Sequence, residues 1–239
     1  MILFMSVSFT AQTMALQRAM ETARPRSSRL FDDPLARDFL RGPLRAAADL
    51  AAVPIAGRIV PALYDLIWPG PRPSAVARTR LIDDTLAGAM ADGIAQVVLL
   101  GAGFDSRAWR LPAIRRAHVI EVDRPDTQYA KVAALRRTRQ PLELASFTPV
   151  DFEHQGVIDG SVHFPEAARW VRSVARAGEP WTFGFLPAAL PGYLAARGFT
   201  LSWDVSTAEA GRRYFGPAGR RDRASGLYHV ALAQVPCQS

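Results

Sequence analysis

Residues 96–107 read Gln96-Val-Val-Leu-Leu-Gly-Ala-Gly-Phe-Asp-Ser-Arg107, and this stretch decides the predicted fold. A short, continuous apolar run that ends in glycines is typical of a buried parallel strand followed by a tight turn. Two further apolar runs, at 118–123 and 147–151, each end in an aspartate, and a helix is predicted between them at 125–137. Strands that alternate with helices predict a doubly wound, mostly parallel α/β sheet.

The sequence before this first strand is predicted to be helical. Apolar residues recur there at helical spacing, and Ser8 or Thr10 can cap the first helix. The predicted elements are a helix at 8–24, a turn at 30–34, a helix near 35–40, an irregular or short helical stretch at 54–73, and a helix at 74–92. We therefore predict a single domain, 1–239, with a helical cap at 1–92 and the α/β sheet core at 93–239.

The chain after the third strand has fewer strand signals. Gly198, directly after a helical pattern, is a typical helix stop. The predicted elements are a helix at 163–177, an extended piece at 181–185, a helix at 187–197, strands at 200–205 and 227–233, and a loop at 216–226.

The composition is that of an ordinary globular protein without a basic stripe. The net charge is +7, and of the 29 basic residues only Lys131 is a lysine. Nucleic-acid-binding proteins usually cluster their basic residues, whereas the arginines here are spread along the whole chain. No run approaches the ~18 apolar residues of a membrane span, and the short apolar start lacks the features of a signal peptide. We expect a cytoplasmic protein that binds neither nucleic acid nor membrane, in an oligomeric state that the sequence leaves open.

Residues that could bind a metal ion are sparse. Cys237 is the single cysteine and the four histidines lie without ligand spacing, so we expect neither an internal disulfide nor a Cys/His metal site. The acidic pairs Asp32-Asp33 and Asp83-Asp84 are interpreted as helix caps or salt-bridge partners, because adjacent residues of a helix point in different directions. His154 is interpreted as a loop histidine.

The candidate site lies at the carboxyl ends of the three strands, where ligands bind in open α/β sheets. The glycines let the backbone of Gly101-Ala102-Gly103 approach a ligand closely. Asp123 lies 20 residues beyond Gly103, a position at which a carboxylate can accept both hydroxyls of a ribose. Asp151 ends the third strand, where it can meet an adenine amino group.

Two cofactors fit a glycine loop with a ribose-binding acid: a dinucleotide and S-adenosyl-L-methionine. A dinucleotide fingerprint, G-x-G-x-x-G/A, presents a helix N-terminus to a pyrophosphate. Here Asp105 stands inside the loop, and Ser106 and Arg107 follow it. A negative Asp105 is a poor neighbour for a pyrophosphate and a good one for a cationic methionine moiety. The residues therefore favour S-adenosyl-L-methionine, with a nicotinamide-dependent oxidoreductase as the alternative.

Several strings resemble the leucine carboxyl methyltransferase-like family of bacterial S-adenosyl-L-methionine-dependent methyltransferases. They are Arg78-Thr-Arg-Leu-Ile-Asp-Asp84, Val97-Val-Leu-Leu-Gly-Ala-Gly-Phe-Asp-Ser-Arg107, Ala108-Trp-Arg-Leu111, Glu121-Val-Asp-Arg-Pro125, Ser8-Phe-Thr-Ala11, Leu30-Phe-Asp-Asp-Pro34 and Glu179-Pro-Trp-Thr-Phe-Gly184. The resemblance covers nearly the whole chain. It implies a class I methyltransferase fold, which is Rossmann-like, with an N-terminal helical cap.

The resemblance also implies roles for single residues. Arg78 is expected to contact the methionine carboxylate, a role that suits an arginine fork. Gly101 is expected to line the cofactor and Asp123 to hold its ribose, while Asp151 and Phe152 meet the adenine. The implied reaction transfers a methyl group to a carboxylate or hydroxyl of a small molecule, and positioning the acceptor supplies much of the catalysis. No catalytic residue is assigned.

The middle of the chain departs from the family. Only 48 residues separate Asp151 from Thr200, and two more strand–helix units would each need a dozen or more residues per crossover. The family's Glu-Gly motif after the third strand has no counterpart. We therefore expect that one or two central strands are missing, with 161–163 or 181–185 as substitutes. The alternative function is an inactive or truncated methyltransferase homologue that retains only partial cofactor binding.

Overall fold

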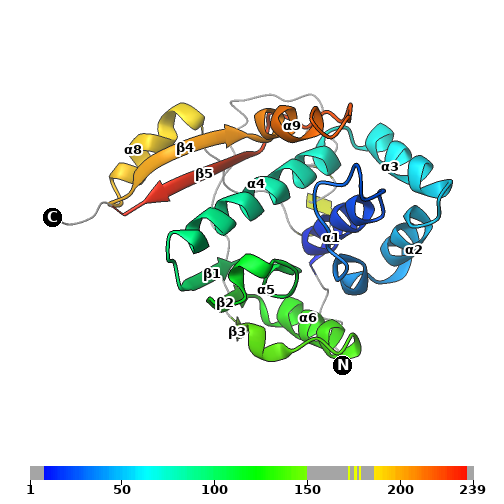
Figure 1. Ribbon diagram of the computed structural model, residues 1–239, viewed down its shortest axis with the longest axis horizontal. Coiled ribbons are helices and arrows are strands. Elements are labelled where there is room, and N and C mark those ends of the chain that lie inside the picture. The colour runs from blue at the N-terminus through cyan, green and yellow to red at the C-terminus, as the bar shows by residue number, and fades with distance from the viewer. Residues whose placement is uncertain (1–7, 150–171, 173–174, 177, 179–185, 236–239) are drawn as a thin grey trace. The chain divides into compact units, whose positions relative to one another are not determined.

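The computed structural model describes residues 8–149, 172, 175–176, 178 and 186–235 (Figure 1). By its internal contacts the chain divides into two compact units. The first comprises Met1–Ile67 and Thr79–Glu153, and the second comprises Trp68–Arg78 and His154–Ser239. Helix α4 (Pro71–Ala91) contributes residues to both units.

Helices form the N-terminal part of the first unit. They are α1 (Phe9–Thr22), the 3-10 helix η1 (Ala36–Phe39), α2 (Gly42–Ala51) and α3 (Ala56–Ile67). Helix α1 begins where the sequence predicts, because the Ser8 side chain accepts a hydrogen bond from the N–H of Ala11 at 3.0 Å. Helix α1 packs against α2 and η1. The stacked rings of Phe39 and Phe104, 5.1 Å apart, extend this core to the loop after the first strand.

The helical content at 42–73 exceeds the prediction. The stretch predicted as irregular or as a short helix contains α3, whose 12 residues continue through Pro61, and α4 begins at Pro71. Helix α2 has no predicted counterpart. The prolines of this stretch favour an irregular structure in the sequence, whereas its apolar residues Ile59, Leu63 and Ile67 recur at helical spacing. In the structure these residues lie on the exposed face of α3.

A parallel sheet follows in the first unit. Its strands are β1 (Gln96–Leu100), β2 (His118–Asp123) and β3 (Ser146–Pro149), in the order β1-β2-β3. Helix α5 (Arg107–Arg110) and the 3-10 helix η2 (Pro112–Ile114) connect β1 to β2, and α6 (Pro125–Arg137) and the 3-10 helix η3 (Leu142–Leu144) connect β2 to β3. The predicted strands and the helix at 125–137 are confirmed within the described residues. Because the strands are parallel, their carboxyl ends meet at one edge of the sheet.

Strand β2 presents one face to the protein interior. Val119, Glu121 and Asp123 are buried, and the residues between them are more exposed. This alternation places the three side chains on the same side of the strand. The side chain of Gln128 in α6 donates to the main-chain oxygen of Glu121 at 3.0 Å, so α6 lies against this strand.

The second unit contains an antiparallel pair of strands. The elements are the 3-10 helix η4 (Pro187–Ala189), α8 (Leu190–Ala195), β4 (Thr200–Ser206), α9 (Thr207–Phe215) and β5 (His229–Gln234), with β4 paired to β5. The predicted strands at 200–205 and 227–233 are confirmed with small shifts of their bounds, as is the loop at 216–226. Gly198 follows α8 with a φ of +78°, as its role as a helix stop requires.

Helix α9 has no predicted counterpart, although the sequence contains a signal for it. Ser206 and Glu209 form a capping box, in which each side chain bonds to the backbone of the other residue. The spacing of a serine and a glutamate three residues apart is the pattern that identifies such a helix start.

Several predictions lie outside the described residues. These are Asp151, Phe152, His154, most of the helix at 163–177, and the substitute strands at 161–163 and 181–185. In the part of the chain that is described, β1 lies at one edge of the three-stranded sheet. None of the helices described there is both long and apolar enough to cross a membrane.

The cap of α9 gives a first test of the second unit. Ser206→Ala is expected to lower the free energy of unfolding by about 1 kcal/mol, because the Ser206 hydroxyl accepts the N–H of Glu209 at 3.2 Å. Denaturant unfolding measures the change. Ser202→Ala, at an exposed position of β4, is the matched control and should change stability by less than about 0.5 kcal/mol. Equal losses in the two variants would contradict the capping role.

Candidate functional site

The loop Gly101–Asp105 joins β1 to α5 and has a conformation that requires glycine. Gly101 and Gly103 have φ values of +63° and +52°, in the left-handed region that glycine adopts readily. The N–H of Asp105 donates to the oxygen of Ala102 at 2.8 Å, and the N–H of Ala102 donates to the oxygen of Val122 at 3.1 Å. A Cβ atom added at Gly101 would meet no heavy atom of the described chain within 4 Å. The loop is therefore held tightly against the end of β2 while the space at Gly101 stays open.

Asp123 lies directly beside this loop. Its Oδ2 atom accepts a hydrogen bond from the N–H of Gly103, and its Oδ1 atom accepts one from the N–H of Arg124 at 2.6 Å. The residue is buried. An ionised carboxylate has about four acceptor positions, so acceptor capacity remains after these two bonds. The structure thus brings Gly103 and Asp123 together, and the hydrogen bond between them closes the loop on β2. The binding of a ribose by Asp123 stays a prediction.

Asp105 is directed toward the helix that follows it. Its Oδ1 atom accepts the N–H of Arg107 at 2.8 Å, and its Oδ2 atom forms an ion pair with the Arg107 guanidinium. Burial alone would raise the pKa of Asp105, but attraction from Arg107, Lys131 and Arg18 outweighs burial and holds the pKa well below its ordinary value. Asp105 is therefore ionised and its charge is balanced within the protein. Its contact with a cofactor stays a prediction.

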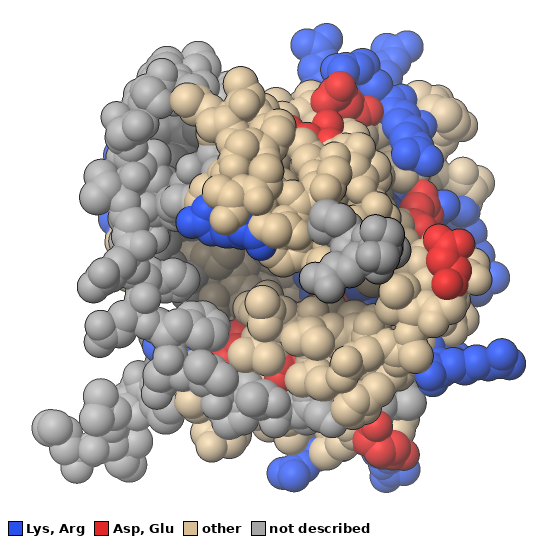
Figure 2. Space-filling view, turned by 90° about the vertical axis from the view of Figure 1, so that its left-hand side faces the viewer, with Lys and Arg blue, Asp and Glu red and all other residues tan. Residues whose placement is uncertain are grey.

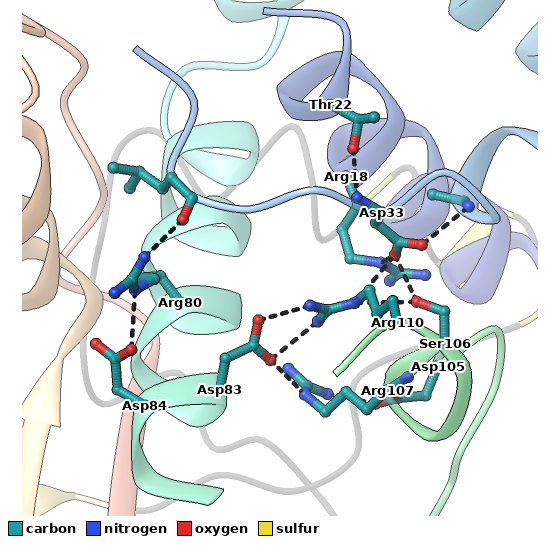
Figure 3. Close-up of polar contacts among 12 residues, drawn as sticks. Arg18, Thr22, Asp33, Arg80, Asp83, Asp84, Asp105, Ser106, Arg107 and Arg110 are labelled. Atoms are coloured by element: carbon teal, nitrogen blue, oxygen red, sulfur yellow. Dashed lines mark hydrogen bonds and ion pairs between the residues drawn. The ribbon is translucent and has the colours of Figure 1, made fainter. Parts of the chain in front are cut away.

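A buried set of charged side chains surrounds the loop (Figure 3). We call it the arginine–aspartate network; its members are Arg18, Asp33, Asp83, Asp105, Ser106, Arg107 and Arg110. On one side, Asp33 Oδ2 accepts from Arg18 Nε at 2.8 Å and from the Ser106 hydroxyl at 2.7 Å. Arg18 also donates to the main-chain oxygen of Phe104 at 2.5 Å. The network therefore fixes α1 to the loop.

Asp83 of α4 holds the other side of the network (Figure 3). Its two oxygens accept from Arg110 at 2.7 and 2.9 Å, and its Oδ1 atom also accepts from Arg107 Nε at 2.7 Å. Arg107 in turn pairs with Asp105. One aspartate thus restrains both arginines of α5, and through Arg107 it restrains the loop itself.

The interpretation of the two acidic pairs is confirmed. Asp33 also caps η1, because its Oδ1 atom accepts the N–H of Ala36 at 3.1 Å. The outer members of the pairs form ion pairs with residues near them in sequence, Asp32 with Arg29 at 2.8 Å and Asp84 with Arg80 at 2.9 Å. Among the described residues, no group of three or more His, Cys, Asp and Glu side chains is placed to hold a metal ion.

A buried ion pair lies near the loop, and sequence reasoning did not identify it. Lys131 Nζ is 2.5 Å from Glu121 Oε2, and both side chains are 0% exposed. Lys131 also lies over the Trp109 ring, 5.4 Å from its centroid. Burial raises the pKa of Glu121 to about 7; Lys131 opposes this rise, and Asp105 and Asp123 add to it. The sequence contained a signal for this pair: an acidic residue, Glu121, interrupts an apolar strand, and the chain has a single lysine.

The remaining predicted cofactor residues are not part of this cluster. Arg78 lies in α4, in the part of the helix that belongs to the second unit. Asp151 and Phe152 lie outside the described residues. The predicted site residues that the structure brings together are therefore Gly101, Ala102, Gly103, Asp105 and Asp123.

One face of the surface is shown in Figure 2. Basic and acidic side chains are interspersed near its right-hand margin, and much of the described surface there is neither acidic nor basic.

A comparison with protein families identifies the chain. The family model described as leucine carboxyl methyltransferase matches residues 11–159, which include α1, the glycine loop and Asp123. The chain belongs to the leucine carboxyl methyltransferase family. Its fold is accordingly the class I methyltransferase fold, to which the parallel sheet with its helical connections corresponds.

Relatives in the family are longer than this chain. A protein of Frankia alni is 37% identical over an alignment of 163 residues, which covers 65% of this chain and 53% of the relative. One of Mycolicibacterium paratuberculosis is 35% identical over an alignment of 213 residues, which covers 82% of this chain and 61% of the relative. Both names provisionally describe an S-adenosyl-L-methionine-dependent methyltransferase. The chain thus spans about half to three fifths of these two proteins.

One solved structure is a more distant match. A crystal structure from Pyrococcus horikoshii, provisionally titled an RNA methyltransferase, is 14% identical with a TM-score of 0.31, covering 80% of this chain and 82% of that one. A likeness of this size supports no argument on fold or function.

Adjacent aspartates provide a test of the arginine–aspartate network. Asp33→Ala is expected to lower the free energy of unfolding by about 3 to 5 kcal/mol, because it leaves the buried Arg18 without its carboxylate partner. Asp32→Ala is the matched control, since the Asp32 side chain is 50% exposed, and its cost should be below about 1 kcal/mol. Chemical denaturation of both variants gives the comparison. Similar costs would show that the network does not stabilise the fold.

Glu121 should make stability depend on pH. The folded protein binds the Glu121 proton more tightly than the unfolded chain does, with a pKa of about 7 against 4.5. Binding of this proton stabilises the folded protein. The full stabilisation is present below pH about 4.5 and is lost as the pH rises through about 7. Glu121→Gln cannot titrate, so its unfolding free energy should fall less steeply between these values than that of the wild type. Denaturant titrations across this range test the difference, and equal slopes would contradict it.

Proposed function

We propose that the protein is an S-adenosyl-L-methionine-dependent O-methyltransferase that methylates a carboxylate or hydroxyl of a small molecule. The observation that carries the proposal is the contact between Gly103 and Asp123. It joins an open glycine loop to a carboxylate with spare acceptor capacity at the carboxyl ends of β1 and β2. Membership of the leucine carboxyl methyltransferase family and the names of the relatives support the same activity.

The described residues fit the cofactor at the loop. The open space at Gly101 allows a ligand to approach the backbone, and the carboxylate of Asp123 can accept hydrogen bonds from ribose hydroxyls. The resemblance adds Arg78 for the methionine carboxylate, and Asp151 with Phe152 for the adenine. When bound, S-adenosyl-L-methionine supplies an electrophilic methyl group on a sulfonium. The contribution of this chain is to orient cofactor and acceptor, and an acceptor that is already an ionised carboxylate needs no general base.

The loop suits a nicotinamide dinucleotide less well. A dinucleotide site places the pyrophosphate at the N-terminus of the helix that follows the loop. Helix α5 has only four residues, and the N–H of Arg107 at its start is bonded to Asp105 at 2.8 Å. The Ser106 hydroxyl is bonded to Asp33, so this position serves the network. These contacts leave little capacity for a pyrophosphate.

A specific observation favours the second candidate, a truncated homologue with only partial cofactor binding. The side chains of Val98 and Leu100 in β1 are 51% and 78% exposed, although apolar strands of parallel sheets are usually covered on both faces. The chain also spans only part of its relatives. A partial site of this kind would bind the cofactor and transfer no methyl group.

Calorimetric titration with S-adenosyl-L-methionine and S-adenosylhomocysteine tests the proposal. We expect micromolar binding of both ligands, and for Asp123→Ala an affinity at least about tenfold lower, because hydrogen bonds to a charged group contribute about 1.5 to 3 kcal/mol. Asp84→Ala is the control, since Asp84 lies in α4 and pairs there with Arg80. Its affinity should equal that of the wild type.

The outcomes separate the candidates. Binding followed by methyl transfer to carboxylic acids or alcohols supports the enzyme, and binding without transfer to any acceptor supports the truncated homologue. A folded wild type that binds neither ligand would refute both. Unchanged binding in Asp123→Ala would refute the ribose-binding role of Asp123.

A further inference from the structure

We propose that Lys131 is a positioning residue for the loop Gly101–Asp105. Its buried ammonium offsets the negative charge that gathers where β1 and β2 end, and this keeps the loop closed on Asp123. The identity of the loop's ligand rests on the proposed function. The closure of the loop does not, because it is a property of the protein alone.

Three carboxylates gather at this end of the sheet. Glu121 and Asp123 lie on the same buried face of β2, and Asp105 lies at the end of the loop after β1. Glu121 and Asp123 are two residues apart on one strand, and Asp123 accepts the N–H of Gly103, which lies two residues before Asp105 in the loop. Like charges gathered at this end of the sheet repel one another, and the pKa of Glu121, which Asp105 and Asp123 both raise, agrees with this. Repulsion of this kind favours any movement that separates the loop from β2.

Lys131 is placed to counter that repulsion. Its ammonium is 0% exposed and pairs with Glu121 at 2.5 Å, and its attraction helps to hold the pKa of Asp105 low. The ring of Trp109 lies 5.4 Å from the ammonium, and the indole N–H donates to the main-chain oxygen of Pro141 at 2.8 Å. The ammonium is therefore enclosed between an acidic cluster and an aromatic ring that is itself fixed.

The stability gained from the ion pair with Glu121 does not by itself explain why a lysine stands at position 131. The Oε1 atom of Glu121 is buried and accepts no hydrogen bond from the described residues. A buried pair with an unsatisfied oxygen contributes little to stability compared with an uncharged pair of similar volume. A stabilising ion pair is therefore not a sufficient reason for a lysine at this position. We assign the role of Lys131 to the ammonium charge that it places at this end of β2, beside Glu121.

Two single substitutions separate this role from a purely structural one. Lys131→Met and Glu121→Gln both break the same buried ion pair, but only Lys131→Met removes the ammonium. If the ion pair is purely structural, both variants should loosen the loop equally. The positioning role predicts that Glu121→Gln leaves the loop closed, because the ammonium then acts on Asp105 without competition from Glu121.

Amide hydrogen exchange measures loop closure without any ligand. The N–H of Gly103 donates to Asp123 and the N–H of Asp105 donates to Ala102, so both amides report on the loop. In Lys131→Met we expect both to exchange about tenfold faster or more, a factor that corresponds to about 1.4 kcal/mol. In Glu121→Gln their rates should stay within about twofold of the wild type. Glu21→Gln, which changes another fully buried carboxylate in the first unit, controls for loss of stability in general.

A double variant covers the case in which Lys131→Met fails to fold. Glu121→Gln/Lys131→Met leaves no buried charge at either position, so its folding should recover. It differs from Glu121→Gln only in the ammonium, so its loop amides should exchange about tenfold faster than those of Glu121→Gln. Titration with S-adenosylhomocysteine, under conditions in which every variant is folded, should show about tenfold weaker binding for the double variant than for Glu121→Gln.

The possible results decide the proposal. Faster loop exchange whenever the ammonium alone is removed, from the wild type and from Glu121→Gln, supports it. Equal exchange in Lys131→Met and Glu121→Gln, or equal exchange in the double variant and Glu121→Gln, overturns it. A wild type that binds no S-adenosylhomocysteine would refute the proposed function, and the exchange rates would still decide the role of Lys131.

Discussion

The first unit depends on the neutralisation of charge inside the arginine–aspartate network. Placing several ions away from water costs several kcal/mol for each of them, and attraction between the ions offsets this cost only where their hydrogen bonds are also satisfied. Asp33 shows how that condition is met. One of its oxygens accepts from both Arg18 and Ser106, and the other accepts from the backbone of η1. Helix, loop and strand are therefore fixed together by polar contacts as much as by apolar packing.

This arrangement explains how a short, glycine-rich loop can be well defined. Gly101 and Gly103 give the loop its left-handed turns, but glycine also gives an unfolded chain more freedom, which opposes folding. The contacts of Arg18 with Phe104 and of Asp123 with Gly103 hold the loop at two points. The backbone near Gly101 then remains accessible without being loose, a condition for binding a ligand through main-chain atoms.

The sequence predicts those features that depend on neighbouring residues. The apolar runs of β1 and β2 and the helix at 125–137 are local patterns, and the structure confirms them. Helix α3 was not predicted in full, because prolines favour irregular structure, yet the helix continues through Pro61. The pair of Glu121 and Lys131 was missed for another reason: it joins a strand to a helix, and only the packed structure reveals which buried charges meet.

The burial of Lys131 also has a practical consequence. Because it is the one lysine of the chain and its side chain is 0% exposed, the folded protein presents no lysine amine to water. Reagents that acylate or crosslink lysine can reach this amine only when the first unit opens. The rate at which Lys131 is labelled therefore reports how often the interior around the glycine loop opens. No further lysine of the chain contributes to this signal.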